Sequence, residues 1–157
     1  TQDGKFKIKY PADWFLIKDE EILKATAPKK WQEKYDFRTL LLAQRFQTEK
    51  FAQLIISEGS FDIMIEEIVE EMKKINQDQG WEVEIVKSDI EKKEGVFEAR
   101  YLIPNSPALY SKEKISSGEK AGEKTETYLI AFVTLEKNWP EFSEQADFIL
   151  DSSQIVQ

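Results

Sequence analysis

Residues 61–79, FDIMIEEIVEEMKKINQDQ, carry the clearest structural signal in the chain. Apolar residues recur at steps of three and four, which places them on one face of an α-helix, with acidic residues opposite. The apolar face comprises Phe61, Met64, Ile65, Ile68, Val69, Met72 and Ile75. Ser60 is placed to cap the start of this helix and Gly80 to end it. Ordering the backbone costs too much for the helix to stand alone, so we expect it to pack on a β-sheet.

Strand patterns lie on both sides of this helix. They cover residues 6–10, 14–17, 37–46, 51–57, 81–90, 96–103 and 125–135. The first two and the next two are expected to form hairpins, and residues 125–135, the most apolar, to lie at the centre of the sheet. Residues 105–123 are rich in Ser, Gly, Lys and Glu, which is typical of a long mobile surface loop.

Two further helices complete the predicted architecture. One is a short helix over residues 28–36, and the other spans residues 139–150 with Pro140 in its first turn. The tail, residues 151–156, is expected to lie along the sheet. We find no internal repeat and no linker, so residues 1–157 form a single domain. The predicted fold class is α+β, a mostly antiparallel sheet of about six to seven strands flanked by helices.

Composition excludes several functions. A net charge of −8 argues against nucleic-acid binding, which needs Lys and Arg to displace counterions from phosphates. The absence of cysteine and histidine removes thiolate chemistry, the commonest metal ligand and the usual general base. We therefore expect no cofactor and no metal centre. No apolar run is long enough for a transmembrane segment. The chain opens on Thr1, which predicts a trimmed chain or a mature form that has lost a targeting segment.

Two groups of residues are candidates for a functional surface. The acidic face of the helix over residues 61–79 carries Glu66, Glu67, Glu70 and Glu71, which we expect to bind a basic protein partner. Carboxylates one helical turn apart could also bind a hard cation or act in acid–base chemistry, and solvated surface charge is the simplest alternative. Trp31 and Tyr35, set among lysines, predict either a recognition patch or a lid packed over one sheet edge.

Several stretches resemble the PsbP/Mog1 superfamily across nearly the whole chain. They are FKIKYPADW at residues 6–14, LLLAQRF at residues 40–46, YLIAFVTL at residues 128–135 and ILDSSQIV at residues 149–156. In that family Tyr10-Pro11 with Trp14 would mark the first hairpin, and Ser152 or Ser153 the end of the last helix. The implied fold is an antiparallel sheet between helices, a PsbP/Mog1-like α/β/α sandwich.

The resemblance also implies a function. Members include a photosystem II extrinsic subunit, a Ran-binding nuclear protein and bacterial lipoproteins, and none is an established enzyme. We expect a non-catalytic binding or assembly module outside the cytoplasm, a monomer that is the soluble domain of a bacterial lipoprotein with a lipid-bearing cysteine upstream of Thr1. The alternative is a cytosolic, Mog1-like regulator that binds its partner through the acidic helix face. A carboxylate-dependent hydrolase is the weakest alternative.

Overall fold

A computed structural model describes residues 5–47 and 50–156 of the chain. Its centre is a seven-stranded antiparallel sheet in the order β2-β3-β4-β8-β7-β6-β5. The strands are β2 (Phe15–Ile17), β3 (Arg38–Gln47), β4 (Lys50–Phe61), β5 (Glu82–Ile90), β6 (Glu94–Leu102), β7 (Leu109–Ala121) and β8 (Lys124–Leu135). The predicted α+β class and the number of strands in the main sheet are therefore confirmed.

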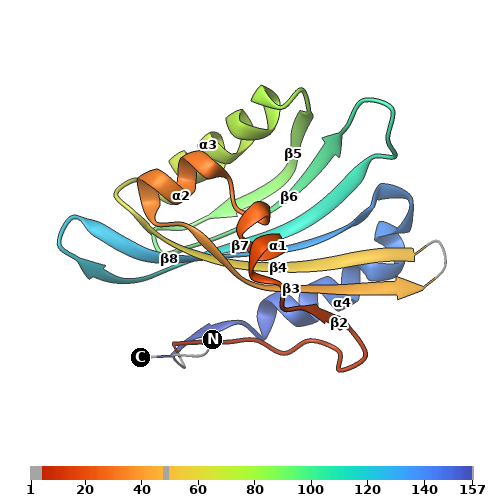
Figure 1. Cartoon of the computed structure of the whole chain (residues 1–157), viewed down its shortest axis with the longest axis horizontal. Helices are drawn as coiled ribbons and strands as arrows, with labels where there is room; N and C mark the ends of the chain where they lie inside the picture. The colour runs from red at the N-terminus through yellow and green to blue at the C-terminus, as the bar shows by residue number, and fades with distance from the viewer. Residues whose placement is uncertain (1–4, 48–49, 157) are drawn as a thin grey trace.

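Helical layers cover both faces of this sheet (Figure 1). Helices α2 (Lys29–Tyr35) and α3 (Ile65–Asp78) lie on one side, where α1 (Glu20–Thr26) leads into α2. Helix α4 (Trp139–Asp151) lies on the other side, after a 3-10 turn at Glu136–Asn138. Beside it, β1 (Phe6–Lys7) and β9 (Gln154–Ile155) form a two-stranded sheet of their own. The tail thus pairs with β1 instead of the main sheet.

Each face of the sheet has its own aromatic core. The core under α4 is built around Phe6, Trp14, Tyr128, Phe132 and Phe142. The core under α2 and α3 is built around Trp31, Tyr35, Phe37, Phe61, Phe97 and Tyr101. Strands β2 and β3 contribute to the core under α4, strands β5, β6 and β7 contribute to the core under α2 and α3, and β4 and β8 at the middle of the sheet contribute to both.

Helix α3 begins later than the sequence pattern predicts. Ser60 and Phe61 are the last residues of β4, where Phe61 pairs with Thr125 of β8, so strand pairing extends into the predicted first turn. Met64 takes the N-cap position, and its backbone N–H donates to Glu67 Oε2 at 2.8 Å. The predicted end is confirmed: Gly80 has φ +86°, a left-handed conformation that favours glycine at a helix C-terminus.

The predicted first hairpin is wrong. β1 pairs with β9, and β2 pairs with β3 through Phe15 and Gln44. The physical reason is the burial of two aromatic rings on the α4 side of the sheet. Phe6 stacks on Tyr128 with ring centroids 4.8 Å apart, and Trp14 packs on Phe132 at 5.8 Å. These contacts draw the N-terminal segment across the face of the sheet, where it cannot fold back on itself.

The predicted loop over residues 105–123 is also wrong for most of its length. Residues 109–121 form β7, which pairs with β6 on one side and β8 on the other. Several of its polar residues are buried, with Ser111 and Glu113 on the same side of the strand as Ile115. Because the pairing satisfies both backbone edges, a strand of loop-like composition is stable at this place in the sheet. The sequence pattern does not predict α1 either, since that helix buries none of its residues.

Candidate functional site

The four predicted glutamates of α3 differ in their surroundings. Glu66, Glu67 and Glu70 are exposed, whereas Glu71 is half-buried. Both carboxylate oxygens of Glu71 accept from the Tyr35 hydroxyl at 2.9 Å, and Lys34 Nζ lies 3.4 Å away. These contacts hold α2 against α3. Burial, more than the neighbouring charges, raises the pKa of the Tyr35 phenol, so this hydroxyl remains a donor at neutral pH.

Two of the glutamates have no internal role in the described part of the chain. Glu67 accepts the N-cap hydrogen bond and Glu71 binds Tyr35. Within residues 5–47 and 50–156, Glu66 and Glu70 form no ion pair and no side-chain hydrogen bond. They lie one helical turn apart on the exposed side of α3. Their charges are therefore available to a partner.

Trp31 and Tyr35 are buried and form no exposed patch. Their exposed fractions are 3% and 0%. Trp31 lies 5.0 Å from Phe37 and 5.4 Å from Phe61 between ring centroids, and Tyr35 lies 4.4 Å from Phe61. The prediction of a recognition patch is thus corrected in favour of its alternative, because both rings fasten α2 over the sheet as a lid.

A groove opens at the N-terminal end of α3. It has a volume of about 1260 Å³ and lies between the β4–α3 connection, the β5–β6 turn and the ends of β7 and β8. Seven carboxylates line it, including Asp62, Glu66 and Glu67, against four lysines, including Lys92 and Lys93. Ile63, Ile65 and Ile90 supply apolar surface. We call this the α3 groove; its excess of carboxylates suits a ligand that carries both basic and apolar groups.

Met64 is the residue of this site that the sequence pattern misplaces. The periodicity puts Met64 on the packing face of the helix, but as N-cap it precedes the first helical turn and 66% of its surface is exposed. It lines the α3 groove beside Glu66. An exposed methionine is flexible and polarizable, and such residues are common at adaptable binding surfaces. The sequence pattern ends the preceding strand at residue 57, whereas β4 runs to Phe61 and delays the start of the helix, so the exposure of Met64 follows from the structure and not from a local pattern.

Among the described residues, the α3 groove contains neither a cluster of metal ligands nor the carboxyl whose pKa is raised. No group of three or more His, Cys, Asp or Glu side chains in the described residues is arranged to hold a metal ion. Within the part of the chain that the structure describes, the carboxyl with a raised pKa is Glu113 of β7, and burial is the main cause. Its Oε1 accepts from Tyr101 Oη at 2.7 Å and from Ser111 Oγ at 2.8 Å. This carboxyl belongs to the core under α2 and α3 and does not line the α3 groove.

The buried carboxyl of Glu113 predicts a pH-dependent stability. Because burial raises its pKa above the ordinary value of 4.5, the folded protein keeps a proton that the unfolded chain releases, so this group costs stability as the pH rises. Glu113→Gln should therefore gain stability relative to the wild type as the pH rises above the ordinary value of 4.5 towards the raised pKa of the folded carboxyl. Urea unfolding at a series of pH values measures this difference. A stability difference that stays constant over that range would contradict the assignment.

Comparisons with known proteins bear on the fold. No protein-family model matches the chain, and no curated protein matches it by sequence. The solution structure of cyanobacterial PsbP (CyanoP) from Synechocystis sp. PCC 6803 is similar with a TM-score of 0.61 and 15% identity, over 99% of this chain and 89% of CyanoP. The crystal structure of LpqN, described as involved in cell envelope biogenesis of Mycobacterium tuberculosis, is similar with a TM-score of 0.53 and 10% identity, over 97% of this chain and 83% of LpqN. The fold is therefore PsbP-like, as the sequence resemblance predicts.

Proposed function

We propose that this PsbP-like chain is a non-catalytic binding module that docks a basic and apolar segment of a partner protein in the α3 groove. One observation carries the proposal: exposed Met64 lies beside Glu66 in a groove whose charged residues are mostly carboxylates. Interfaces gain most of their affinity from a few apolar anchors, and complementary charge at the rim steers association. Met64 supplies such an anchor and Glu66 supplies charge in the groove, while exposed Glu70 adds a further charge one helical turn along α3, outside the groove lining.

We further propose that the domain is a monomer that works outside the cytoplasm, as an assembly component of the cell envelope. The likeness to LpqN, whose description names cell envelope biogenesis, supports this location. Among the residues that the structure describes, every helix is too short or too polar to cross a bilayer. Fractionation of source cells with mass spectrometry of the native N-terminus tests the location. Recovery of an unmodified chain from the cytosol would overturn it and leave a cytosolic regulator that uses the same surface.

Reversing the charge of the two unpaired glutamates is expected to weaken partner binding. In Glu66→Lys/Glu70→Lys, two attractive charges become repulsive, so the Kd should rise about tenfold or more at low salt. The melting temperature should change little, because both side chains are exposed. The partner is captured from source-cell extract, identified by mass spectrometry and purified, and its Kd is measured by calorimetry.

The matched control carries the same change of charge elsewhere. Glu33 on α2 and Glu144 on α4 are exposed and form no ion pair within the described residues, so Glu33→Lys/Glu144→Lys changes net charge equally. This control should bind the partner with nearly the wild-type Kd. If both double variants lose affinity to the same extent, the effect is one of net charge and the proposed site is wrong.

A further inference from the structure

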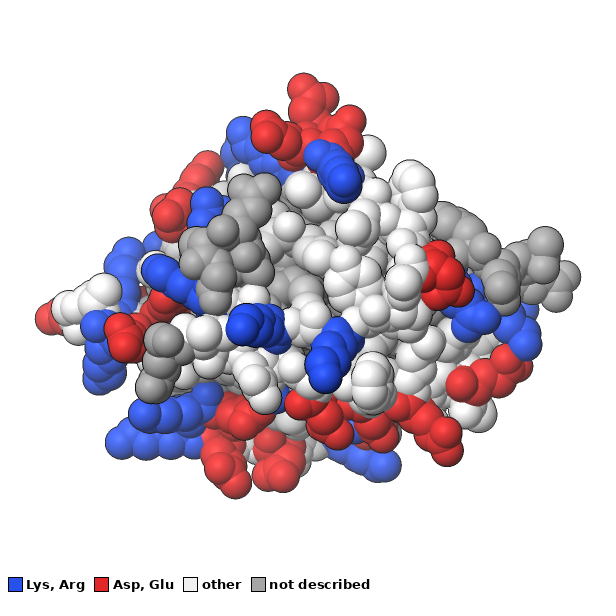
Figure 2. Space-filling view, turned by 90° about the horizontal axis from the view of Figure 1, so that it is seen from below, with Lys and Arg blue, Asp and Glu red and all other residues white. Residues whose placement is uncertain are grey.

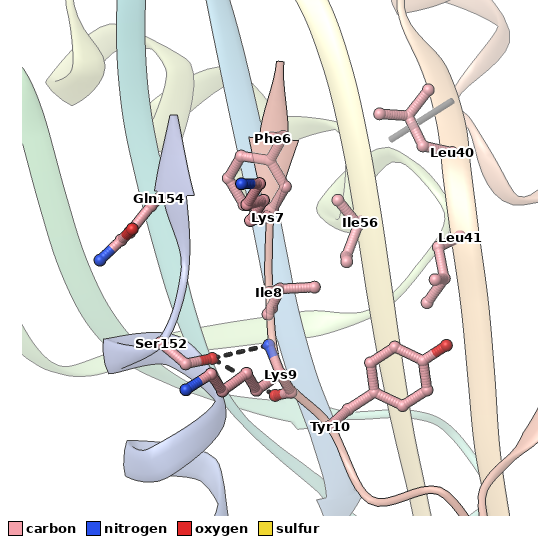
Figure 3. A pocket seen from close by; sticks show the side chains of 10 residues that line it. All are labelled: Phe6, Lys7, Ile8, Lys9, Tyr10, Leu40, Leu41, Ile56, Ser152 and Gln154. Carbon is pink, nitrogen blue, oxygen red and sulfur yellow. Dashed lines mark hydrogen bonds between the residues drawn. The ribbon is translucent and has the colours of Figure 1, made fainter. Parts of the chain in front are cut away.

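A second groove lies on the α4 side of the sheet, away from the α3 helix. Residues 6–10 form one wall, and β3 and β4 form the floor (Figure 3). Its volume is about 740 Å³, within the range of about 300–1,000 Å³ that is typical of small-molecule sites. Its apolar lining consists of Phe6, Ile8, Tyr10, Leu40, Leu41 and Ile56. We call it the strap groove, after the N-terminal segment that bounds it.

The wall formed by residues 6–10 is firmly attached. Ser152 Oγ accepts from the backbone N–H of Lys9 at 2.9 Å and donates to the carbonyl of Ile149 at 2.7 Å, which ties the segment to the end of α4 (Figure 3). Val156 N donates to the Lys5 carbonyl at 2.6 Å. At the start of the segment, Phe6 stacks on Tyr128. A ligand would therefore meet a groove that is already formed, which lowers the entropic cost of binding.

The charge of the strap groove is opposite to that of the chain. Its ten lining residues include Lys7 and Lys9 and no Asp or Glu, although the chain has a net charge of −8. Neither lysine forms an ion pair within the described residues. Figure 2, which views this side of the molecule, shows carboxylates around the rim, most of them along the lower edge, and a mostly uncharged middle with a few basic side chains. An anionic ligand is thus favoured here, whereas the α3 groove favours a cationic one.

We propose that the strap groove binds a long-chain carboxylate, the anion of a fatty acid. The alkyl chain lies along Ile8, Leu41 and Ile56, and the carboxylate meets Lys7 and Lys9 at the solvent-exposed side. Apart from these lysines, the side chains that line the groove offer few polar groups, namely those of Tyr10, Ser152 and Gln154. A ligand with one charged end and a plain hydrocarbon chain matches this distribution better than a peptide, whose backbone would need many hydrogen-bond partners.

Calorimetry with dodecanoate, below its micelle concentration, tests the proposal directly. One molecule should bind per chain, and decanoate, shorter by two methylenes, should bind roughly tenfold more weakly.

Lys7→Glu/Lys9→Glu should weaken dodecanoate binding about fivefold at low salt. The control Lys18→Glu/Lys29→Glu changes the charge of two other exposed lysines that form no ion pair within the described residues, and should bind like the wild type. Leu40→Trp, which fills the groove, should abolish binding.

Three results would overturn the proposal. The first is no heat of binding with dodecanoate. The second is equal loss of affinity in the two lysine variants, and the third is equal affinity for dodecanoate and decanoate. Binding to vesicles that contain phosphatidylglycerol is measured as well. If the protein binds these vesicles through Lys7 and Lys9 but does not bind dodecanoate, the two lysines contact a membrane surface and the proposal is wrong. If Leu40→Trp does not fold, as judged by its melting curve, the chain-length and lysine comparisons still decide the outcome.

Discussion

Trp31→Ala is expected to destabilise the protein by about 3–5 kcal/mol, the usual cost of truncating a buried tryptophan to alanine. The side chain of Trp31 is 3% exposed and its ring contacts those of Tyr35, Phe37 and Phe61. Its Nε1 has no hydrogen-bond partner in the structure, so the loss is one of packing and apolar burial. Removing it would leave a cavity between α2 and the sheet. Urea or thermal unfolding measures the change in the free energy of unfolding.

Lys30→Ala, on the same helix, is the matched control for this substitution. Lys30 is exposed, and its contact with Asp78 is a solvated ion pair at 3.8 Å. We expect a change within about 0.5 kcal/mol for this control. If Trp31→Ala lowered the free energy of unfolding no more than Lys30→Ala does, α2 would not be a lid packed on the sheet. The alternative that Trp31 belongs to a recognition patch would then be favoured.

Phe142→Ala is expected to destabilise the other core by a comparable amount, about 3–5 kcal/mol. Phe142 is 2% exposed on α4 and lies 6.1 Å from Phe132 between ring centroids. Phe148 on the same helix is 60% exposed, so Phe148→Ala should change stability by only about 0.5 kcal/mol. Chemical denaturation of the two variants compares identical substitutions on one helix. Similar losses in both would contradict the orientation of α4 on the sheet.

The sequence predicts those elements whose side-chain pattern agrees with their environment. Helix α3 has one apolar and one acidic face, and β8 is a run of mostly apolar residues at the centre of the sheet, so both are correctly predicted. β7 is missed because its place between two strands stabilises it, and its own composition contributes little. The pairing of β1 with β9 joins residues about 150 positions apart, and no local pattern records such a contact.

The part of the candidate site that rests on local side-chain spacing is predictable from the sequence, and the part that rests on packing between elements is not. The acidic face of α3 follows from spacing alone, and the structure leaves Glu66 and Glu70 exposed. Which glutamates are already engaged depends on α2, since Tyr35 reaches Glu71 only after both helices pack on the sheet. The exposure of Met64 depends on where β4 ends. The strap groove forms because residues 6–10 run across the sheet and β1, at their start, pairs with β9. The predicted N-terminal hairpin would give this segment a different path, so the sequence pattern does not predict the groove.

Site-specific photo-crosslinking at position 64 tests the proposed α3 groove most directly. A photoreactive phenylalanine analogue replaces Met64 in the full-length protein in source cells, and the same analogue replaces exposed Phe148 as the control. We expect one discrete protein adduct from position 64, with a basic surface segment at the crosslink. That adduct should be absent from position 148 and reduced by Glu66→Lys/Glu70→Lys. No adduct at position 64, or the same adducts from both positions, would contradict the account.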